Sequence, residues 1–249
     1  MHTKDSLIAQ LSAMLPSDAT VLMHSSCKSL GQMENGGDTI LDALTEYFSR
    51  GLVVLPTHTW ATVNDRQPVY DVLYTPVCIG LLPELFRKRP GVHRSWHPTH
   101  SVAAFGADAE EFVRGDENCP TPCARDSAWG RLYDRDAYVL LVGVELNRMT
   151  FFHGVEEWNG IPGRLKETPN RYVVIPPDGG RIVRDYYPHC GDSSQLYPKA
   201  ETALLHAGAM RMEKLGDATV RLLSCRKSVE VVSSLLKDNP FFFGKAGYR

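Results

Sequence analysis

The feature that most constrains the fold is an uncharged apolar run followed closely by a helical pattern. Residues 138–144 read Tyr-Val-Leu-Leu-Val-Gly-Val, and a short polar turn separates them from a segment with helical periodicity that extends to Glu157. An apolar run of this kind is typical of a strand that is covered on both faces of a sheet. A strand that leads into a helix predicts an α/β fold.

The first quarter of the chain repeats this pattern. Apolar runs at 21–23 and 52–55 enclose a helical pattern for which Asp38 is the expected N-terminal cap, and an earlier helix, capped by Asp5, is expected over 7–15. Strand, helix and strand within about 35 residues predict parallel neighbours in one sheet.

The rest of the chain predicts further elements of both kinds. Helices are expected over 80–89, 126–133, 196–210 and 228–237, strands over 101–105 and 218–223, and a hairpin over 171–175 and 181–184. We therefore expect an α/β fold with a mixed central sheet flanked by helices on both faces. The prediction is a single domain, 1–249, with a C-terminal hairpin-bearing subdomain over roughly 164–249.

Composition narrows the class of partner. The chain has 249 residues and a formal net charge of -2, so it has no excess of basic residues for nucleic acid or an anionic membrane. No run approaches the ~20 apolar residues that a membrane span needs, and the N-terminus lacks a signal-peptide pattern. The six cysteines are expected to be reduced thiols. We expect a cytoplasmic protein with small-molecule partners; monomer and homodimer both remain open.

Four polar side chains are predicted to share one face of the helix after residue 147. Thr150, His153, Glu156 and Glu157 stand at i, i+3, i+6 and i+7. An imidazole with a carboxylate one turn away is suited to general-base chemistry, because the carboxylate fixes the tautomer and the other ring nitrogen takes a proton. A purely structural His153 beside surface glutamates is the alternative.

A polar loop follows the predicted strand at 21–23, and such loops bind ligands in α/β proteins. Its hydroxyls, backbone N–H groups and one cation suit a phosphate or an amide-bearing ligand. The residues are His24, Ser25, Ser26, Lys28, Ser29, Leu30 and Gly31. The loop is not a P-loop, because Lys28 precedes Gly31. An unliganded connection is the alternative.

Metal and thiol chemistry provide competing hypotheses. His93, His97, His100 and His153 suggest a metal-dependent hydrolase, although Pro98 disfavours a helix that would align the middle two. The pair Cys119 and Cys123 is better explained as loop residues, because two prolines stand in its spacer. Cys27, in the polar loop, is a minority hypothesis for a nucleophile.

Several collinear blocks resemble the aminoglycoside 3-N-acetyltransferase family. They extend from about residue 20 to residue 160, and the tail after them fits more loosely. The blocks are His24-Ser25-Ser26, Ser29-Leu30-Gly31, 52–57, 80–84, Arg94-Ser95 with His97-Pro98 and Ser101, Asp126-Ser127 with Gly130 and Leu132, and Asn147-x-x-Thr150-x-x-His153-x-x-Glu156.

The resemblance implies acetyl transfer from acetyl-CoA to a primary amine of an aminoglycoside or amino sugar, with a role in antibiotic resistance and without a metal. It implies that His153 is the base, that Glu156 orients it and that Thr150 lies near the thioester carbonyl. The pantetheine channel would involve the polar loop with His100 and Ser101. The acceptor side would involve Asp126, Glu157 and Thr57, with Asp71 as a further acidic residue. A non-catalytic acyl-CoA-binding protein is a third hypothesis.

Overall fold

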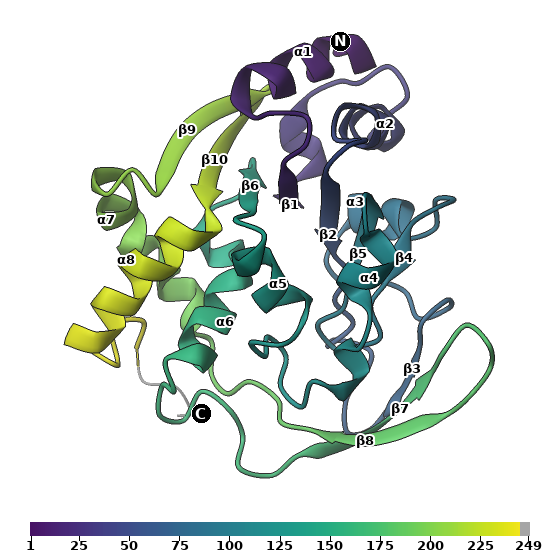
Figure 1. Ribbon diagram of the computed structural model, residues 1–249, viewed down its shortest axis with the longest axis vertical. Coiled ribbons are helices and arrows are strands. Elements are labelled where there is room, and N and C mark those ends of the chain that lie inside the picture. Colours follow the sequence, from purple (N-terminus) through teal and green to yellow (C-terminus); the bar gives the residue numbers. More distant parts are fainter. Residues whose placement is uncertain (245–249) are drawn as a thin grey trace.

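A seven-stranded mixed sheet forms the centre of the computed structural model, which describes residues 1–244 (Figure 1). The inner strand β1 pairs in parallel with its two neighbours, and every other pairing in this sheet is antiparallel. In spatial order the strands are β4 (His93–Arg94), β5 (Val102–Gly106), β2 (Leu52–Pro56), β1 (Thr20–Ser25), β6 (Tyr138–Val142), β10 (Ala218–Ser224) and β9 (Met210–Leu215). The predicted mixed sheet is confirmed.

Helices cover both faces of this sheet, as predicted. Alternate residues of a strand point to opposite faces, so Leu22 of β1 packs in one core cluster and Met23 in the other. Helices α1 (Lys4–Met14), α2 (Gly37–Tyr47) and α3 (Leu81–Phe86) contribute to the cluster around Met23. Helices α4 (Ala109–Val113), α5 (Ala128–Asp134), α6 (Phe151–Trp158), α7 (Glu201–His206) and α8 (Cys225–Asp238) contribute to the cluster around Leu22.

The predicted hairpin is present and belongs to a second, three-stranded sheet. Its strands β7 (Asn170–Ile175) and β8 (Ile182–Tyr186) are antiparallel, and β3 (Val69–Asp71) from the first half of the chain pairs in parallel with β7. This sheet lies at one edge of the molecule, with its own small core of tyrosines and valines (Figure 1). After the hairpin the chain returns to the main sheet and forms β9 and β10.

Three local predictions were wrong. The N-cap of α1 is Thr3, which exchanges side-chain hydrogen bonds with Ser6, and α2 begins after Gly36 with Asp38 in its first turn. The helix expected over 196–210 is divided: a 3-10 helix, η4 (Ser193–Ala200), precedes α7, and β9 begins at Met210. Pro198 lies within η4, and Gly208, with φ of 61°, follows α7 and allows the turn into β9.

Three shorter 3-10 helices connect the main elements: η1 (Cys27–Leu30), η2 (Asp116–Asn118) and η3 (Leu146–Arg148). Within residues 1–244, no helix combines the length and apolar character needed to cross a membrane. In the sheet, β2 lies on one side of β1 and β6 lies on the other side. A parallel sheet that reverses direction in this way opens a crevice at the carboxyl ends of its strands.

Candidate active site

A cavity of about 810 Å³ lies at the carboxyl ends of the three parallel strands. His24 and Ser25 line it at the end of β1, and His58 follows β2. Thr150 and His153 line it from the start of α6, which follows β6 after η3. The crevice expected from the strand order therefore contains the polar loop residue Ser25 and the predicted base His153 in one wall.

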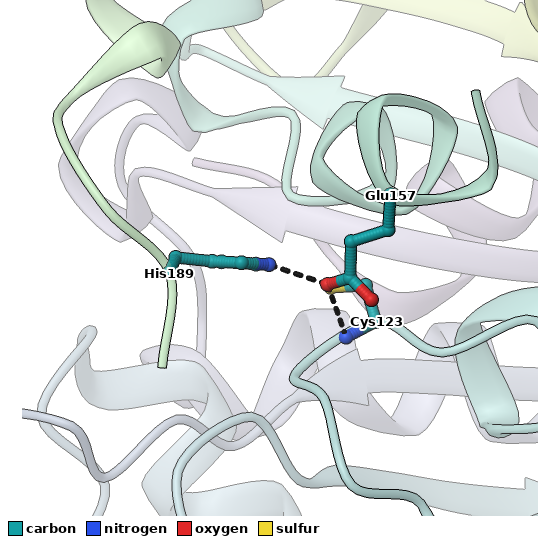
Figure 2. Close-up of side chains that lie close together, drawn as sticks. All are labelled: Cys123, Glu157 and His189. Atoms are coloured by element: carbon teal, nitrogen blue, oxygen red, sulfur yellow. Dashed lines mark hydrogen bonds and ion pairs between the residues drawn. The ribbon is translucent and has the colours of Figure 1, made fainter. Parts of the chain in front are cut away.

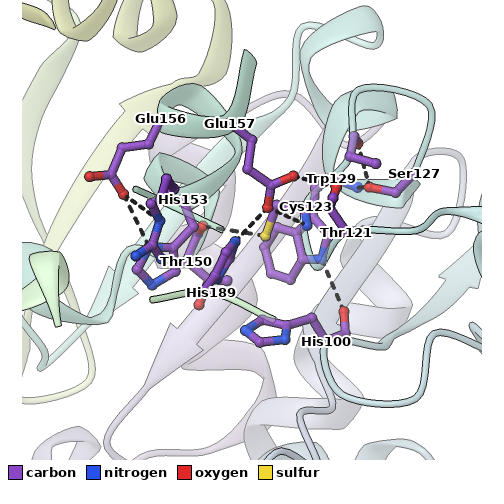
Figure 3. Close-up of polar contacts among 12 residues, drawn as sticks. His100, Thr121, Cys123, Ser127, Trp129, Thr150, His153, Glu156, Glu157 and His189 are labelled. Carbon is purple, nitrogen blue, oxygen red and sulfur yellow. Dashed lines mark hydrogen bonds and ion pairs between the residues drawn. The ribbon is translucent and has the colours of Figure 1, made fainter. Parts of the chain in front are cut away.

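His153 is held from one side of its ring. Its Nδ1 lies 3.4 Å from Oε2 of Glu156 and 2.7 Å from a terminal guanidinium nitrogen of Arg164, and the hydroxyl of Tyr197 also contacts it. Figure 3 shows His153 beside Glu156. The side chain of His153 is 16% exposed and lines the cavity. Among the described residues, Nε2 makes no hydrogen bond. The geometry therefore leaves one ring nitrogen free at the cavity wall.

Glu156 is the buried centre of this network. Its Oε2 accepts hydrogen bonds from Tyr197 at 2.6 Å and from Ser193 at 3.0 Å, and Nε of Arg164 lies 3.1 Å away. Burial opposes its ionisation, but the hydrogen bond to His153 and the charge of Arg164 outweigh burial and lower the pKa of Glu156. The carboxylate is therefore ionised at neutral pH.

Burial also sets the protonation of the imidazoles. It lowers the pKa of His153 below 6.5, although Glu156 partly opposes that change, so the ring is neutral at pH 7. Burial likewise lowers the pKa of His24 to about 3 and those of His58, His100 and His189 well below their usual value. All four line the cavity with His153. This wall is rich in neutral hydrogen-bonding groups.

The predicted donor loop lies partly behind the cavity wall. His24, Ser25 and His100 line the cavity, whereas Ser26, Lys28, Ser29, Leu30 and Gly31 do not. Leu30 is fully buried in the core. Ser101 is buried as well, and its Oγ lies 2.8 Å from the hydroxyl of Thr57, so both residues tie the ends of β2 and β5 together.

The two glutamates of α6 point in different directions. Consecutive helical residues are rotated by about 100°. Glu157 therefore turns to Thr121, whose hydroxyl donates at 2.5 Å, to the backbone N–H of Cys123 at 2.9 Å, and to Nε2 of His189 at 2.5 Å. The predicted single face thus brings Glu156, but not Glu157, to His153. Asp126 is exposed and, like Glu157 and Thr57, is not part of the cavity lining.

The histidines of the hydrolase hypothesis do not converge on a metal site. Nδ1 of His97 instead accepts hydrogen bonds from the backbone N–H groups of Thr99 and His100. Within residues 1–244, one group of potential ligand atoms lies within 4.8 Å, from Cys123, Glu157 and His189 (Figure 2). Two of its members already hydrogen-bond to Glu157, so we interpret it as a hydrogen-bonded cluster. Cys27 lies in η1, outside the cavity lining, and burial raises its thiol pKa.

Several residues of the site were missed in the sequence, among them His58, Arg164, His189, Ser193 and Tyr197. Arg164 lies between α6 and the hairpin, whereas His189, Ser193 and Tyr197 reach the site because the chain folds back after the hairpin. The polar stretch around His189 was the one local signal, since it follows the predicted hairpin. Tyr197 lies within a segment whose helical pattern gave no reason to separate it from core residues.

Comparisons with known proteins place the chain among aminoglycoside N-acetyltransferases. The chain is 28% identical to the SPbeta prophage-derived aminoglycoside N(3')-acetyltransferase-like protein YokD of Bacillus subtilis strain 168, over 96% of this chain and 93% of that protein. It is 27% identical to aminoglycoside N(3)-acetyltransferase VII of Streptomyces paromomycinus, over 92% and 89%.

A solved structure extends the comparison. The crystal structure of a histidine-to-alanine mutant of aminoglycoside acetyltransferase AAC(3)-IVa in complex with a gentamicin superposes with a TM-score of 0.84 at 26% identity, covering 97% of this chain and 90% of that one. The model of the aminoglycoside 3-N-acetyltransferase family matches residues 22–237, so the chain belongs to this family of N-acetyltransferases.

Proposed function

We propose that this protein transfers the acetyl group of acetyl-CoA to a primary amine of an aminoglycoside or amino sugar, by direct attack of the amine with His153 as general base. The observation that carries the proposal is the neutral imidazole of His153, held by Tyr197 and Glu156, with a free nitrogen at the wall of a cavity of about 810 Å³. Family membership and the gentamicin complex of the AAC(3)-IVa mutant support the substrate class.

The base function depends on the tautomer of His153. An alkylammonium cannot attack a thioester, so a proton must leave the nitrogen during the reaction. The hydroxyl of Tyr197 donates to Glu156, which leaves its oxygen free to accept a hydrogen bond from Nδ1 of His153. A proton on Nδ1 places the lone pair of His153 on Nε2, where it can take the proton of the amine.

Other cavity residues suit the remaining steps. The hydroxyl of Thr150 lies 3.3 Å from Nε2 of His58 and is available as a donor to the developing oxyanion of the thioester. Ser25 and His100 are proposed to contact pantetheine, with the loop over 26–31 toward the phosphates. Asp65 and Asp192 line the cavity and are suited to bind the cationic amines of the acceptor. Binding of the acceptor by Asp126, Glu157 and Thr57 stays a prediction.

The test is release of CoA thiol from acetyl-CoA across a panel of aminoglycosides and amino sugars. With an active amine, His153→Ala is expected to lower kcat by ~100-fold or more, the range of general-base catalysis. His206→Ala, at an exposed position on α7, is the matched control and should retain the rate. A His153→Ala protein with wild-type activity would contradict the mechanism. Tight CoA binding without transfer to any amine would favour the non-catalytic hypothesis.

A further inference from the structure

The adjacent residues Glu156 and Glu157 have opposite surroundings. Glu156 lies beside the cation Arg164 and accepts hydrogen bonds from two hydroxyl groups. Glu157, whose side chain is 5% exposed, contacts only neutral groups: the hydroxyl of Thr121, the backbone N–H of Cys123 and the imidazole of His189. The adjacent cation favours a carboxylate at Glu156, whereas burial without a contacting cation favours a protonated carboxylic acid at Glu157.

His189 connects Glu157 to the cavity. Its Nε2 lies 2.5 Å from Oε1 of Glu157, and its ring lines the cavity with a centroid 4.9 Å from that of His153 (Figures 2 and 3). Nδ1 of His189 makes no hydrogen bond within the described part of the chain. Two imidazoles from different segments therefore line the cavity, and each of them contacts its own glutamate.

The charges around the second pair fit a proton donor. Burial raises the pKa of Glu157 to about 7, and Glu156 adds to that rise, while Thr121, Cys123 and the charge of Arg164 oppose it. Burial lowers the pKa of His189 well below 6.5, and Arg164 and the imidazoles of His153, His100 and His97 lower it further. Below about pH 7 the exchangeable proton of the pair thus resides on the carboxyl group.

We infer that His189 and Glu157 form a proton-donating pair that protonates the departing thiolate of CoA, opposite in role to the proton-accepting pair of His153 and Glu156. The inference rests on the proposed function. Two carboxyl groups that share a site and hold different protonation states are the usual signature of an acid and a base in one reaction. Nothing in the base mechanism itself uses Glu157 or His189.

Proton transfers at both pairs accompany the transfer of the acetyl group. The amine nitrogen bonds to the acetyl carbon and the carbon–sulfur bond breaks, while the amine proton moves to Nε2 of His153. The proton on Nδ1 of His189 moves to sulfur as the carboxyl proton of Glu157 moves to Nε2 of His189. The products are the N-acetyl amine and CoA thiol. Solvent then returns the extra proton of His153 to Glu157.

The experiment measures single-turnover acetyl transfer against pH, with the amine that the wild type uses best. The wild-type rate should fall above about pH 7, where Glu157 loses its proton. Glu157→Gln keeps the hydrogen-bonding shape but carries no transferable proton, so the rate should drop by ~100-fold and the decline near pH 7 should disappear. Glu110→Gln, on the exposed face of α4, is the matched control and should leave both unchanged.

Two further variants separate proton donation from a structural role. His189→Gln can keep a contact with Glu157 but lacks the proton of Nδ1, so it should behave like Glu157→Gln. Thr121→Val removes a hydrogen bond that lowers the pKa of Glu157, so the decline should move to higher pH. If Glu157 had only a structural role, Thr121→Val would not raise the pH at which the rate declines. These two variants also decide the matter if Glu157→Gln does not fold.

The outcomes are distinguishable from failure of the proposed function. If wild type transfers acetyl to no amine, the proposed function itself fails. If wild type is active and His153→Ala is not, but Glu157→Gln and His189→Gln keep the wild-type rate and pH profile, the proton-donating pair is overturned. If the fall in rate of Thr121→Val begins at the same pH as in the wild type, the proton-donating pair is also overturned, because Glu157 would then not be the group that titrates.

Discussion

At the scale of single residues, Tyr197 decides whether His153 can act as a base. Nδ1 of His153 is contacted by three groups: the Tyr197 hydroxyl and, at 3.4 Å, Oε2 of Glu156, which can both accept its proton, and Arg164, which can only donate to it. An Nδ1 that accepts from Arg164 would place the ring proton on Nε2, where a base needs a lone pair. The tyrosine therefore favours the productive tautomer over the one favoured by the arginine.

The variant Tyr197→Phe tests this competition. Without the hydroxyl, Nδ1 keeps the donor Arg164 at 2.7 Å and only the longer contact of 3.4 Å to the acceptor Glu156, so the unproductive tautomer gains. We therefore expect kcat to fall by ~100-fold while KM for acetyl-CoA changes little. Tyr47→Phe is the control, because it also removes one tyrosine hydroxyl bond, to the carbonyl of Leu15, but far from the cavity. Unchanged kcat in Tyr197→Phe would mean that the ring tautomer is set by another group.

The residue scale also shows what the sequence could and could not predict. His153 and Glu156 are three residues apart on one helix, so helical periodicity placed them together correctly. Tyr197 and Arg164 lie 44 and 11 positions from His153. Their contacts depend on the path of the chain after α6, before the hairpin for Arg164 and after it for Tyr197. Local patterns carry no information on such contacts. The divergence of Glu156 and Glu157 likewise depends on what packs against α6.

At the scale of elements, the end of β6 and the loop after β1 are fitted closely together. Gly143 follows β6 with φ of +64°, and a Cβ placed there would lie 2.2 Å from Cβ of Ser29 in η1. The two segments that are proposed to frame the donor and carry the base thus meet where only glycine fits. The parallel pairing of β1 with β6, which the sequence did not predict, brings these segments together.

Gly143→Ala tests the fit between these elements. Gly160 has φ of +63°, and a Cβ placed there would meet no atom within 4 Å, so Gly160→Ala isolates the backbone strain, of order 1–3 kcal/mol. Gly143→Ala adds the clash with Ser29 and should destabilise the protein more in urea unfolding, with weaker acetyl-CoA binding. Equal losses in the two variants would show that η1 moves aside freely.

Buried strands could be predicted from the sequence more readily than exposed strands. The runs at 21–23, 52–55 and 138–144 gave β1, β2 and β6, because strands covered on both faces need continuous apolar sequence. Strand β9 was missed, since four of its six residues are not buried and three of those four, Arg211, Glu213 and Lys214, are charged. Its position at the sheet edge, which only the fold reveals, explains that composition.

At the scale of the whole molecule, the cavity and its surroundings bring together buried histidines that are costly to protonate. The pKa values of His24, His58, His97, His100, His153 and His189 are all lowered chiefly by burial. A neutral imidazole wall suits a reaction that needs a free amine, because it does not repel a cationic acceptor. At pH values below the usual pKa of histidine, these buried histidines bind fewer protons in the folded state than in the unfolded state.

Acid sensitivity follows from the sign of these shifts. Unfolded histidines take up protons below about pH 6.5, whereas the folded ones resist until lower pH, near 3 for His24 and His97. Their contribution to stability is therefore present above about pH 6.5 and is lost as the pH falls. Glu157 acts oppositely, because its raised pKa costs stability as the pH rises from 4.5 to about 7. The histidines outnumber it, so we expect net destabilisation on acidification.

Urea unfolding at pH 7.5, 6.5 and 5.5 measures this loss directly. Each buried histidine can contribute up to about 1.4 kcal/mol per pH unit to the slope of the unfolding free energy. His97→Asn keeps an acceptor for the backbone N–H groups of Thr99 and His100 but cannot titrate, so its slope should be smaller by about that amount. His206→Asn, at an exposed site on α7, should keep the wild-type slope. His97 is buried beside His100 and is not part of the cavity lining. If His97→Asn shows the full slope, the acid sensitivity arises from groups other than His97.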